Sequence, residues 1–292
     1  MYPAPIEEYV RPGTLAEAVA ALARFDPGEA LCIAGGQSLM QAIKSRMIRP
    51  RCVVDLQAVA ELKGIGVAAG LRIGAMTRYV EIAECTKLPP AYAALRDAAQ
   101  HVGDRQVRNR GTIGGSCCWN YVASCMPATV LGLGGTFHLM SARGQTREVV
   151  ADEFLLGPLE TARADDEILT AITFPDAPRT GSAYQKWGLV TDALPVVGVC
   201  MRVSLDGAGK CTAARIALSG LAAGAQRAPA GEAVLVGSTG DAAALTKALE
   251  AIIGSVEAQS DKWADTAYRQ QLIRTLGQDV AARAFARARG EA

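Results

Sequence analysis

Histidine and aromatic side chains are scarce in this chain of 292 residues. It has two histidines, His101 and His138, and aromatic residues make up 5% of the sequence. Neither histidine has the spacing of a zinc-binding pair, and Gly36-Gln37-Ser38-Leu39-Met40 lacks the closing glycine of a nucleophile elbow. Hydrolytic zinc chemistry and Ser-His-Asp catalysis therefore have no support, and we predict that His138 is a hydrogen-bonded residue on a strand.

An excess of charge of either sign is also missing. Thirty Lys and Arg residues stand against 29 Asp and Glu, and the isoelectric point is near 7.5. Proteins that coat nucleic acids or anionic membranes carry a basic face, and no such excess exists here. No Gly-x-x-x-x-Gly-Lys phosphate-binding loop occurs either. We expect no nucleic-acid partner.

Paired cysteines of the Cys-x-x-Cys type are absent. The chain has eight cysteines, too few for a disulfide scaffold of this length. The first residues, Met1 to Glu8, lack the basic and apolar regions of a secretory signal. We therefore expect free thiols and a cytoplasmic protein. The cysteines are Cys32, Cys52, Cys85, Cys117, Cys118, Cys125, Cys200 and Cys211.

One long segment contains no carboxylate, lysine or arginine side chain. The 32 residues from Gly111 to Ala142 contain no Asp, Glu, Lys or Arg. Six glycines, Asn120 and Pro127 interrupt the segment, so it does not fit a membrane span. We predict a buried site punctuated by glycines, and no membrane span.

Short strands and helices alternate irregularly, which favours an α+β fold. A strand over 168–174 is followed by the turn-forming run 176–181, so we place a domain boundary near residue 176. This gives an N-terminal domain of residues 1–176 and a C-terminal domain of residues 177–292. In the latter we expect a hairpin around Asp206–Gly209 and helices over about 241–253 and 266–289.

Threonines mark two expected helix starts. Thr14 precedes an alanine-rich stretch that reaches about Phe25, with Glu17 in the position of a capping box. Thr77 precedes Val80 and Ile82 in the same way. We predict that both threonines are helix N-caps.

Two glycine turns are the strongest candidates for a binding site. Ala34–Ser38 follows a predicted strand and precedes a helix, and Thr112–Ser116 repeats the pattern. Glycines let successive backbone N–H groups approach an anion, and a following helix start favours negative charge. Two such turns suit a dinucleotide better than a single phosphate. A third glycine-rich run, 64–70, has the wrong spacing for a Rossmann turn and is expected to be a hairpin.

Several motifs together resemble the FAD-binding medium subunit of molybdenum hydroxylases, the group of carbon monoxide dehydrogenase, quinoline oxidoreductase and xanthine dehydrogenase. The resemblance covers essentially the whole chain. In order, the motifs are Ala34-Gly35-Gly36-Gln37-Ser38-Leu39, Val53-Val54-Asp55-Leu56, Ile73-Gly74-Ala75-Met76-Thr77, Gln106-Val107-Arg108-Asn109-Arg110-Gly111-Thr112-Ile113-Gly114-Gly115 and Met126-Pro127-Ala128.

This resemblance implies an FAD domain of the vanillyl-alcohol-oxidase (PCMH) type with two subdomains, about 1–56 and 57–176. It also implies a C-terminal α+β domain with a small antiparallel sheet. The residues expected to bind FAD, by position, are Leu31, Cys32, Ile33, Ala34, Gly35, Gly36, Gln37, Ser38, Leu39, Val102, Thr112, Ile113, Gly114, Gly115, Ser116, Cys125, Leu169 and Lys186. No catalytic acid or base and no metal ligand is expected on this chain.

The resemblance further implies a role in electron transfer. Such a subunit takes electrons from two [2Fe-2S] clusters of a small partner subunit and passes them through FAD to an external acceptor. The substrate is hydroxylated on a large molybdopterin subunit, and the expected assembly is a dimer of heterotrimers. The alternatives are a stand-alone FAD oxidoreductase of the same fold and a structural subunit that lacks FAD.

Three positions depart from the family pattern. Ser116 stands where relatives usually have Asn, Cys125 where they have an acidic residue, and Ala193 where several have an aromatic residue. A carboxylate at 125 would bind an FAD ribose hydroxyl, so its loss is expected to weaken binding by about 1.5–3 kcal/mol unless Asn120 or Ser124 substitutes. One relative, 4-hydroxybenzoyl-CoA reductase, carries an extra [4Fe-4S] cluster, but this chain lacks the inserted loop, so we expect the cysteines around 117–125 to be buried thiols.

Overall fold

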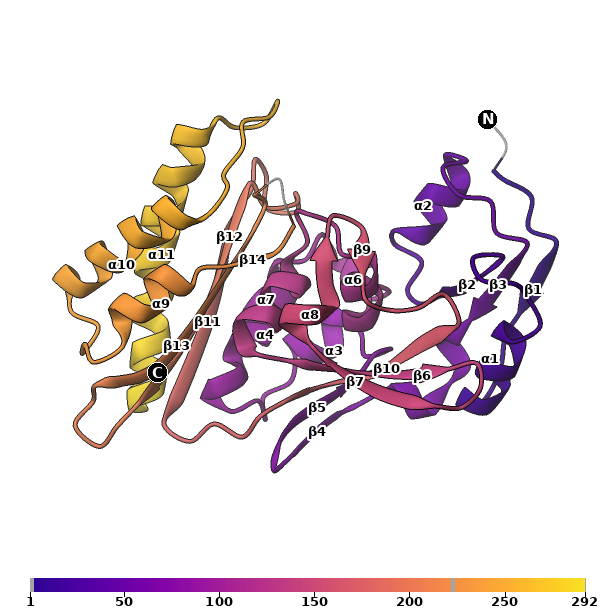
Figure 1. Ribbon diagram of the computed structural model, residues 1–292, viewed down its shortest axis with the longest axis horizontal. Helices are drawn as coiled ribbons and strands as arrows, with labels where there is room; N and C mark the ends of the chain where they lie inside the picture. Colours follow the sequence, from indigo (N-terminus) through magenta and orange to yellow (C-terminus); the bar gives the residue numbers. More distant parts are fainter. Residues whose placement is uncertain (1–2, 222–223, 292) are drawn as a thin grey trace.

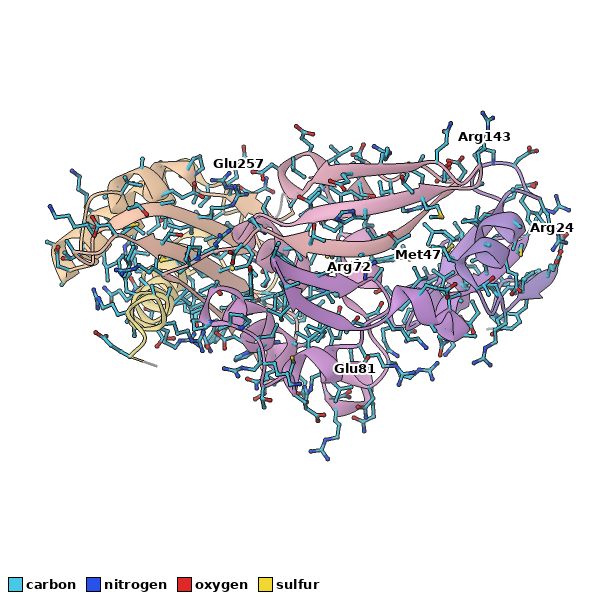
Figure 2. All side chains as sticks on the ribbon, turned by 90° about the horizontal axis from the view of Figure 1, so that it is seen from below. Arg24, Met47, Arg72, Glu81, Arg143 and Glu257 are labelled. Atoms are coloured by element: carbon cyan, nitrogen blue, oxygen red, sulfur yellow. The ribbon has the colours of Figure 1, made fainter. Side chains whose placement is uncertain are left out.

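Three sheets follow one another along the long axis of the molecule in a computed structural model (Figure 1). The structure describes residues 3–221 and 224–291. Helices and strands are mixed within each region, which confirms the α+β prediction. Figure 2 shows the charged side chains of Arg24, Glu81 and Arg143 on the outside of the molecule.

The first sheet is small and parallel. Its strand order is β1-β3-β2, with β1 at Glu8–Val10, β3 at Cys52–Asp55 and β2 at Ala30–Ile33. The helix α1 (Leu15–Leu22) begins as predicted, because the Glu17 backbone N–H donates to Thr14 Oγ1 at 3.2 Å. The short helix α2 (Leu39–Lys44) follows β2. Buried residues of α1 and β3 form the core of this region.

The second sheet is antiparallel, with the order β4-β5-β10-β6-β7. Its helices pack into a large apolar core, and a two-stranded ribbon lies beside it. The strands are β4 (Ile65–Ala68), β5 (Gly70–Gly74), β6 (Thr136–Ser141), β7 (Thr146–Val150), β8 (Leu155–Gly157), β9 (Glu160–Thr161) and β10 (Glu167–Phe174); the helices are α3 (Tyr79–Ala83), α4 (Ala93–His101), α5 (Arg105–Arg108), α6 (Ile113–Trp119), α7 (Cys125–Leu133) and α8 (Ala151–Phe154).

Thr77 does not cap a helix, so that prediction is wrong. The helix α3 begins after Arg78, whose backbone N–H donates to the Glu81 carboxylate at 2.8 Å. The Thr77 hydroxyl instead donates to Gly64 O and accepts from Gly64 N, both at 3.1 Å. The Thr77 hydroxyl therefore makes a tertiary contact with the residue before the β4–β5 hairpin and does not cap α3.

The third sheet contains β11 (Thr180–Trp187), β12 (Val197–Leu205), β13 (Cys211–Ser219) and β14 (Gln226–Arg227), all antiparallel. The predicted hairpin is β12–β13. The predicted helices are present as α10 (Ala242–Ser255) and α11 (Thr266–Arg289), and α9 (Pro229–Leu235) precedes them. These helices cover the outer face of the sheet, where a second apolar core forms.

Polar contacts join the second and third regions. Asp97 of α4 is 6% exposed and accepts hydrogen bonds from Arg287 of α11 at 2.6 and 3.1 Å and from Tyr184 N at 3.1 Å. At the end of α7, Arg202 donates to Leu133 O at 2.8 Å. The inner face of the third sheet therefore rests on α4 and α7 (Figure 1).

The uncharged segment Gly111–Ala142 is largely buried, as predicted. All nine residues of α7 are buried, and Gly134 ends the helix in the left-handed conformation. Within the described ranges, no helix is long and apolar enough to cross a membrane.

Candidate functional site

The first glycine turn leaves its backbone donors unengaged. It follows β2, and Gly36 has φ +75°. Across residues 3–221 and 224–291, the N–H groups of Gly35, Gly36, Gln37 and Ser38 donate no hydrogen bond to another backbone group or side chain. Four successive free donors ahead of a helix match the donor set that binds a phosphate group.

The second glycine turn differs, and here the prediction of free donors is wrong. The N–H of Ile113 donates to Thr77 O at 3.1 Å and that of Gly114 to Ala75 O at 2.9 Å. Gly115 N donates to Thr112 Oγ1 and Ser116 N to Thr112 O, each at 3.1 Å. These glycines serve close packing, because a Cβ on Gly114 would lie 2.6 Å from the Ala75 backbone.

The fold brings the two glycine turns into contact. A Cβ on Gly35 would lie 2.0 Å from Arg110 O and 2.8 Å from Gly111 Cα. A Cβ on Gly115 would lie 3.3 Å from Ala34 Cβ. The free donors of the first turn therefore lie at the junction between the first and second sheet regions, beside the start of α6.

Lys186 lies on the inner side of the third region. It is 7% exposed, and its ammonium donates to Ala193 O. Burial lowers the pKa of Lys186, and the nearby Cys125 and Asp192 oppose that shift. Tyr184, two residues earlier on β11, is also buried, and its hydroxyl has no partner within the described residues.

Cys125 occupies the first turn of α7, close to Lys186. It is 6% exposed, and burial raises the pKa of its thiol. The Asn120 amide is fixed by Nδ2, which donates to Gly157 O at 2.8 Å and to Glu160 O at 2.9 Å, while its buried Oδ1 has no partner among the described residues and remains an open acceptor. Ser124 is partly exposed and its side chain does not cap α7, so it stays available.

The remaining predicted residues lie in different surroundings. Val102 ends α4, and its carbonyl accepts from Arg108 Nη1 at 3.2 Å. Leu169 on β10 is 4% exposed and packs inside the main core. Leu31, Cys32 and Ile33 form the end of β2 that leads into the first glycine turn.

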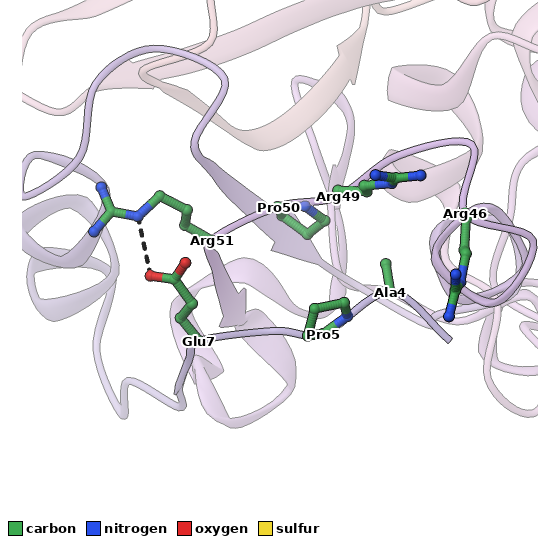
Figure 3. Close-up of a pocket in the computed structure, with 7 residues that line it drawn as sticks. All are labelled: Ala4, Pro5, Glu7, Arg46, Arg49, Pro50 and Arg51. Atoms are coloured by element: carbon green, nitrogen blue, oxygen red, sulfur yellow. Dashed lines mark hydrogen bonds and ion pairs between the residues drawn. The ribbon is translucent and has the colours of Figure 1, made fainter. Parts of the chain in front are cut away.

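A depression of about 260 Å³ lies elsewhere on the first sheet region (Figure 3). Arg51 at its edge is already paired with Glu7 at 3.2 Å and Glu29 at 3.0 Å. None of the residues predicted to bind FAD lines it. The lining residues are Ala4, Pro5, Glu7, Arg46, Arg49, Pro50 and Arg51.

Comparison with known proteins identifies the family. The family described as FAD binding domain in molybdopterin dehydrogenase matches residues 4–177, and the CO dehydrogenase flavoprotein C-terminal domain matches residues 182–284. The chain belongs to the FAD-binding medium subunits of molybdenum hydroxylases. This medium subunit is 32% identical over 267 residues to the carbon monoxide dehydrogenase medium chain of Hydrogenophaga pseudoflava, covering 91% of this chain and 92% of that one.

Other relatives match the medium subunit over nearly its whole length. It is 30% identical to the alpha subunit of the 6-hydroxypseudooxynicotine dehydrogenase complex of Paenarthrobacter nicotinovorans, over 98% of this chain and 96% of the relative. The solved carbon monoxide dehydrogenase of H. pseudoflava superposes with a TM-score of 0.90 at 32% identity, covering 98% and 99% of the two chains. Quinoline 2-oxidoreductase of Pseudomonas putida 86 superposes with a TM-score of 0.89 at 31% identity, over 100% and 99%.

Sequence reasoning missed a polar cluster beside Lys186 in this medium subunit. Strand pairing aligns Lys186 with Gly198, and Gly198 with Ser219. A Cβ on Gly198 would lie 2.5 Å from the Tyr184 hydroxyl and 2.6 Å from Ser219 Oγ, both buried and without a partner in the described chain. The i, i+2 spacing of Tyr184 and Lys186 shows that they share a strand face. The register that adds Ser219 could not be read from the sequence.

Proposed function

We propose that this subunit binds FAD noncovalently and that the turn Gly35–Ser38 holds its pyrophosphate. The observation that supports this most directly is the row of four unengaged N–H groups at the junction of the two glycine turns. Backbone donors at a helix start are complementary to phosphate oxygens. The backbone donors of the first turn are chemically suited to the phosphates of FAD. The Cys125 thiol is a weaker hydrogen-bond acceptor than the carboxylate expected at this position in relatives.

The cofactor-binding set in this proposal is the one expected from the sequence. The second turn takes part through the close approach of its backbone and through the Ser116 side chain, since its N–H groups are engaged. Lys186 supplies a buried positive charge. The set is Leu31, Cys32, Ile33, Ala34, Gly35, Gly36, Gln37, Ser38, Leu39, Val102, Thr112, Ile113, Gly114, Gly115, Ser116, Cys125, Leu169 and Lys186.

The finer architecture belongs to the same proposal. We assign residues 1–176 to an FAD domain of the vanillyl-alcohol-oxidase type, with subdomains 1–56 and 57–176, and residues 177–292 to the C-terminal domain. The separate parallel and antiparallel sheets on either side of residue 57 support the two subdomains. The third sheet with α9–α11 supports a C-terminal unit.

In the complex, this subunit relays electrons from two [2Fe-2S] clusters of a small partner to an external acceptor. A large molybdopterin subunit hydroxylates the substrate, and the assembly is a dimer of heterotrimers in the cytoplasm. Bound FAD supplies the redox chemistry. The protein positions the cofactor, excludes water from its buried parts and places Lys186 nearby, so no general acid or base is required of the chain.

The test is the flavin content of the purified subunit, alone and with its partners. We expect close to one FAD per chain in the absorption spectrum and after denaturation. Gly36→Ala should lower the affinity for FAD, because Gly36 has φ +75° and an alanine shifts the turn. Gly144→Ala is the matched control, since Gly144 has φ +76° and open space around it in the β6–β7 turn.

Two results would contradict the proposal. If no flavin binds even with excess FAD and both partner subunits present, the chain is a structural subunit on a flavoprotein fold. If the isolated subunit turns over a substrate of its own at the rate of the complex, it is a stand-alone oxidoreductase. If Gly36→Ala and Gly144→Ala change FAD affinity equally, the first turn does not bind the pyrophosphate.

A further inference from the structure

The turn between β8 and β9 holds a leucine in a backbone conformation that leucine rarely adopts. Gly157 pairs with Glu160, so Pro158 and Leu159 are the two turn residues, and Leu159 has φ +61°. A tight turn with proline first and a positive φ second ordinarily takes glycine or asparagine in the second place. The left-handed conformation brings the Cβ of a leucine too close to the backbone, so it destabilises this turn.

The Leu159 side chain also lies largely in solvent. It is 52% exposed, and its neighbour Leu156 is 57% exposed. Leu155, by contrast, packs against the main apolar core. An apolar side chain that stays in water contributes little to folding. The folded chain therefore carries a strained leucine whose apolar surface it does not bury.

Asn120 fixes this turn to the end of α6. Leu159 N donates to Asn120 O at 2.9 Å, and Asn120 Nδ2 donates to Gly157 O and Glu160 O. Asn120 is 1% exposed and itself has φ +41°. These bonds hold the turn next to Tyr121, which is 40% exposed, and Figure 1 shows β9 beside α6. We call the resulting apolar surface the turn patch; it consists of Tyr121, Leu156 and Leu159.

The turn patch adjoins the proposed cofactor site. The helix α6 begins at the second glycine turn and ends before Asn120, and α7 begins at Cys125. Tyr121 precedes Cys125 by four residues, which span at most about 14 Å. The third sheet region meets the same connection, because Gly220 N donates to Val122 O at 2.9 Å. A protein bound to the patch therefore stands next to the proposed flavin site.

We propose that the turn patch is the docking surface for the small [2Fe-2S] subunit, and that Leu159 enters an apolar pocket of that partner. This inference rests on the proposed function. Electron transfer slows steeply as the distance between donor and acceptor grows, so the electron donor has to bind beside the flavin. The large subunit and a second copy of this chain have no such requirement.

The rigidity of the turn suits this role. Three hydrogen bonds fix the turn to Asn120 before any partner binds, so docking orders few additional groups. Glu153 and Glu160 are exposed on either side of Leu156 in the sequence. We therefore expect the pocket of the small subunit to carry basic residues at its rim.

The test measures binding of the full-length small subunit to the full-length medium subunit. Leu159→Asn removes the apolar side chain, and asparagine tolerates the left-handed conformation. We expect the dissociation constant to rise about ten- to hundredfold, while the FAD content and the melting temperature of the medium subunit do not fall. Leu159→Met should retain most of the affinity.

Arg179→Asn is the matched control. Arg179 is exposed, has φ +48° and lies in the connection between β10 and β11, outside the turn patch. The same replacement at this left-handed position should leave the affinity for the small subunit unchanged.

Four results would overturn the docking assignment. Leu159→Asn could bind the small subunit normally, it could weaken binding of the large subunit or self-association instead, or it could lower the melting temperature, which would assign the leucine to folding. If the first occurs while the unchanged chain binds FAD, the docking surface is rejected and the proposed function stands. If the unchanged chain binds no FAD with both partners present, the proposed function fails and the docking assignment fails with it.

Discussion

The two glycine turns are similar in sequence but have different roles in the fold. In the first, the N–H groups of Gly35, Gly36, Gln37 and Ser38 donate no hydrogen bond within the described chain. In the second, the N–H groups of Gly114 and Gly115 are engaged by Ala75 and Thr112. The first turn is available to a ligand, whereas the second holds the second sheet region together and lets the first turn pack against it.

The difference shows why a glycine motif alone is weak evidence for a phosphate site. Glycine permits both a free row of donors and close contact between backbones. Only the hydrogen-bond partners distinguish the two uses. Substitutions in the second turn should therefore act mainly on stability, and those around the first turn on FAD affinity.

The largest effect is expected from Gly114→Ala. The new Cβ would lie 2.6 Å from Ala75 Cβ and O, so the free energy of unfolding should fall by about 3 kcal/mol. Gly36→Ala adds only ordinary contacts and should cost about 1–2 kcal/mol through its left-handed backbone. Urea unfolding of both variants measures the contrast, and the reverse order would refute the separation of roles.

Cys125→Asp should tighten FAD binding. It introduces the carboxylate that the family resemblance implies at this position, next to the positive charge of Lys186. A charged hydrogen bond contributes about 1.5–3 kcal/mol, so the dissociation constant should fall roughly ten- to hundredfold.

Titration of the apo-subunit with FAD measures the effect of Cys125→Asp. Cys125→Ser is the control, because a neutral hydroxyl should produce a smaller gain. An unchanged affinity in Cys125→Asp would remove position 125 from the cofactor site.

Thr112→Ala should lower stability by about 1 kcal/mol, the usual cost of losing a helix N-cap. The Thr112 hydroxyl accepts from Gly115 N at 3.1 Å, and this bond keeps the second turn closed. Thr112→Ser retains the hydroxyl and should behave as the unchanged chain in thermal unfolding. If both variants lose the same stability, the methyl group and not the cap is responsible.

Glu167→Gln should have the smallest effect, about 0.5 kcal/mol at pH 7, because Arg147 is half exposed. The Arg147 hydrogen bond holds the pKa of Glu167 below its usual value, although burial opposes this. The contribution is therefore complete above about pH 4.5 and is lost as the pH falls through the folded-state pKa. Unfolding curves of the two proteins should converge in acid, and a constant difference would contradict this origin.

Local sequence predicted the elements whose patterns are self-contained. The hairpin β12–β13 and the helices α10 and α11 were expected from their turn residues and apolar spacing, and Thr14 caps α1 as expected. The prediction that Thr77 caps a helix was wrong because Gly64, thirteen residues earlier, engages its hydroxyl. The prediction of free donors in the second glycine turn was wrong for the same reason, since the acceptors of these N–H groups include Ala75 and Thr77 from another segment.

The sequence by itself determined the family, the α+β class and the positions of the glycine turns, because these depend on motifs and on short-range periodicity. The tertiary structure decided which turn keeps free donors, and that Asn120 is held through Nδ2 while its Oδ1 has no partner among the described residues. Hydrogen-bond donors and buried charges are assigned by whichever acceptor the fold brings within reach, and that acceptor is often far along the chain.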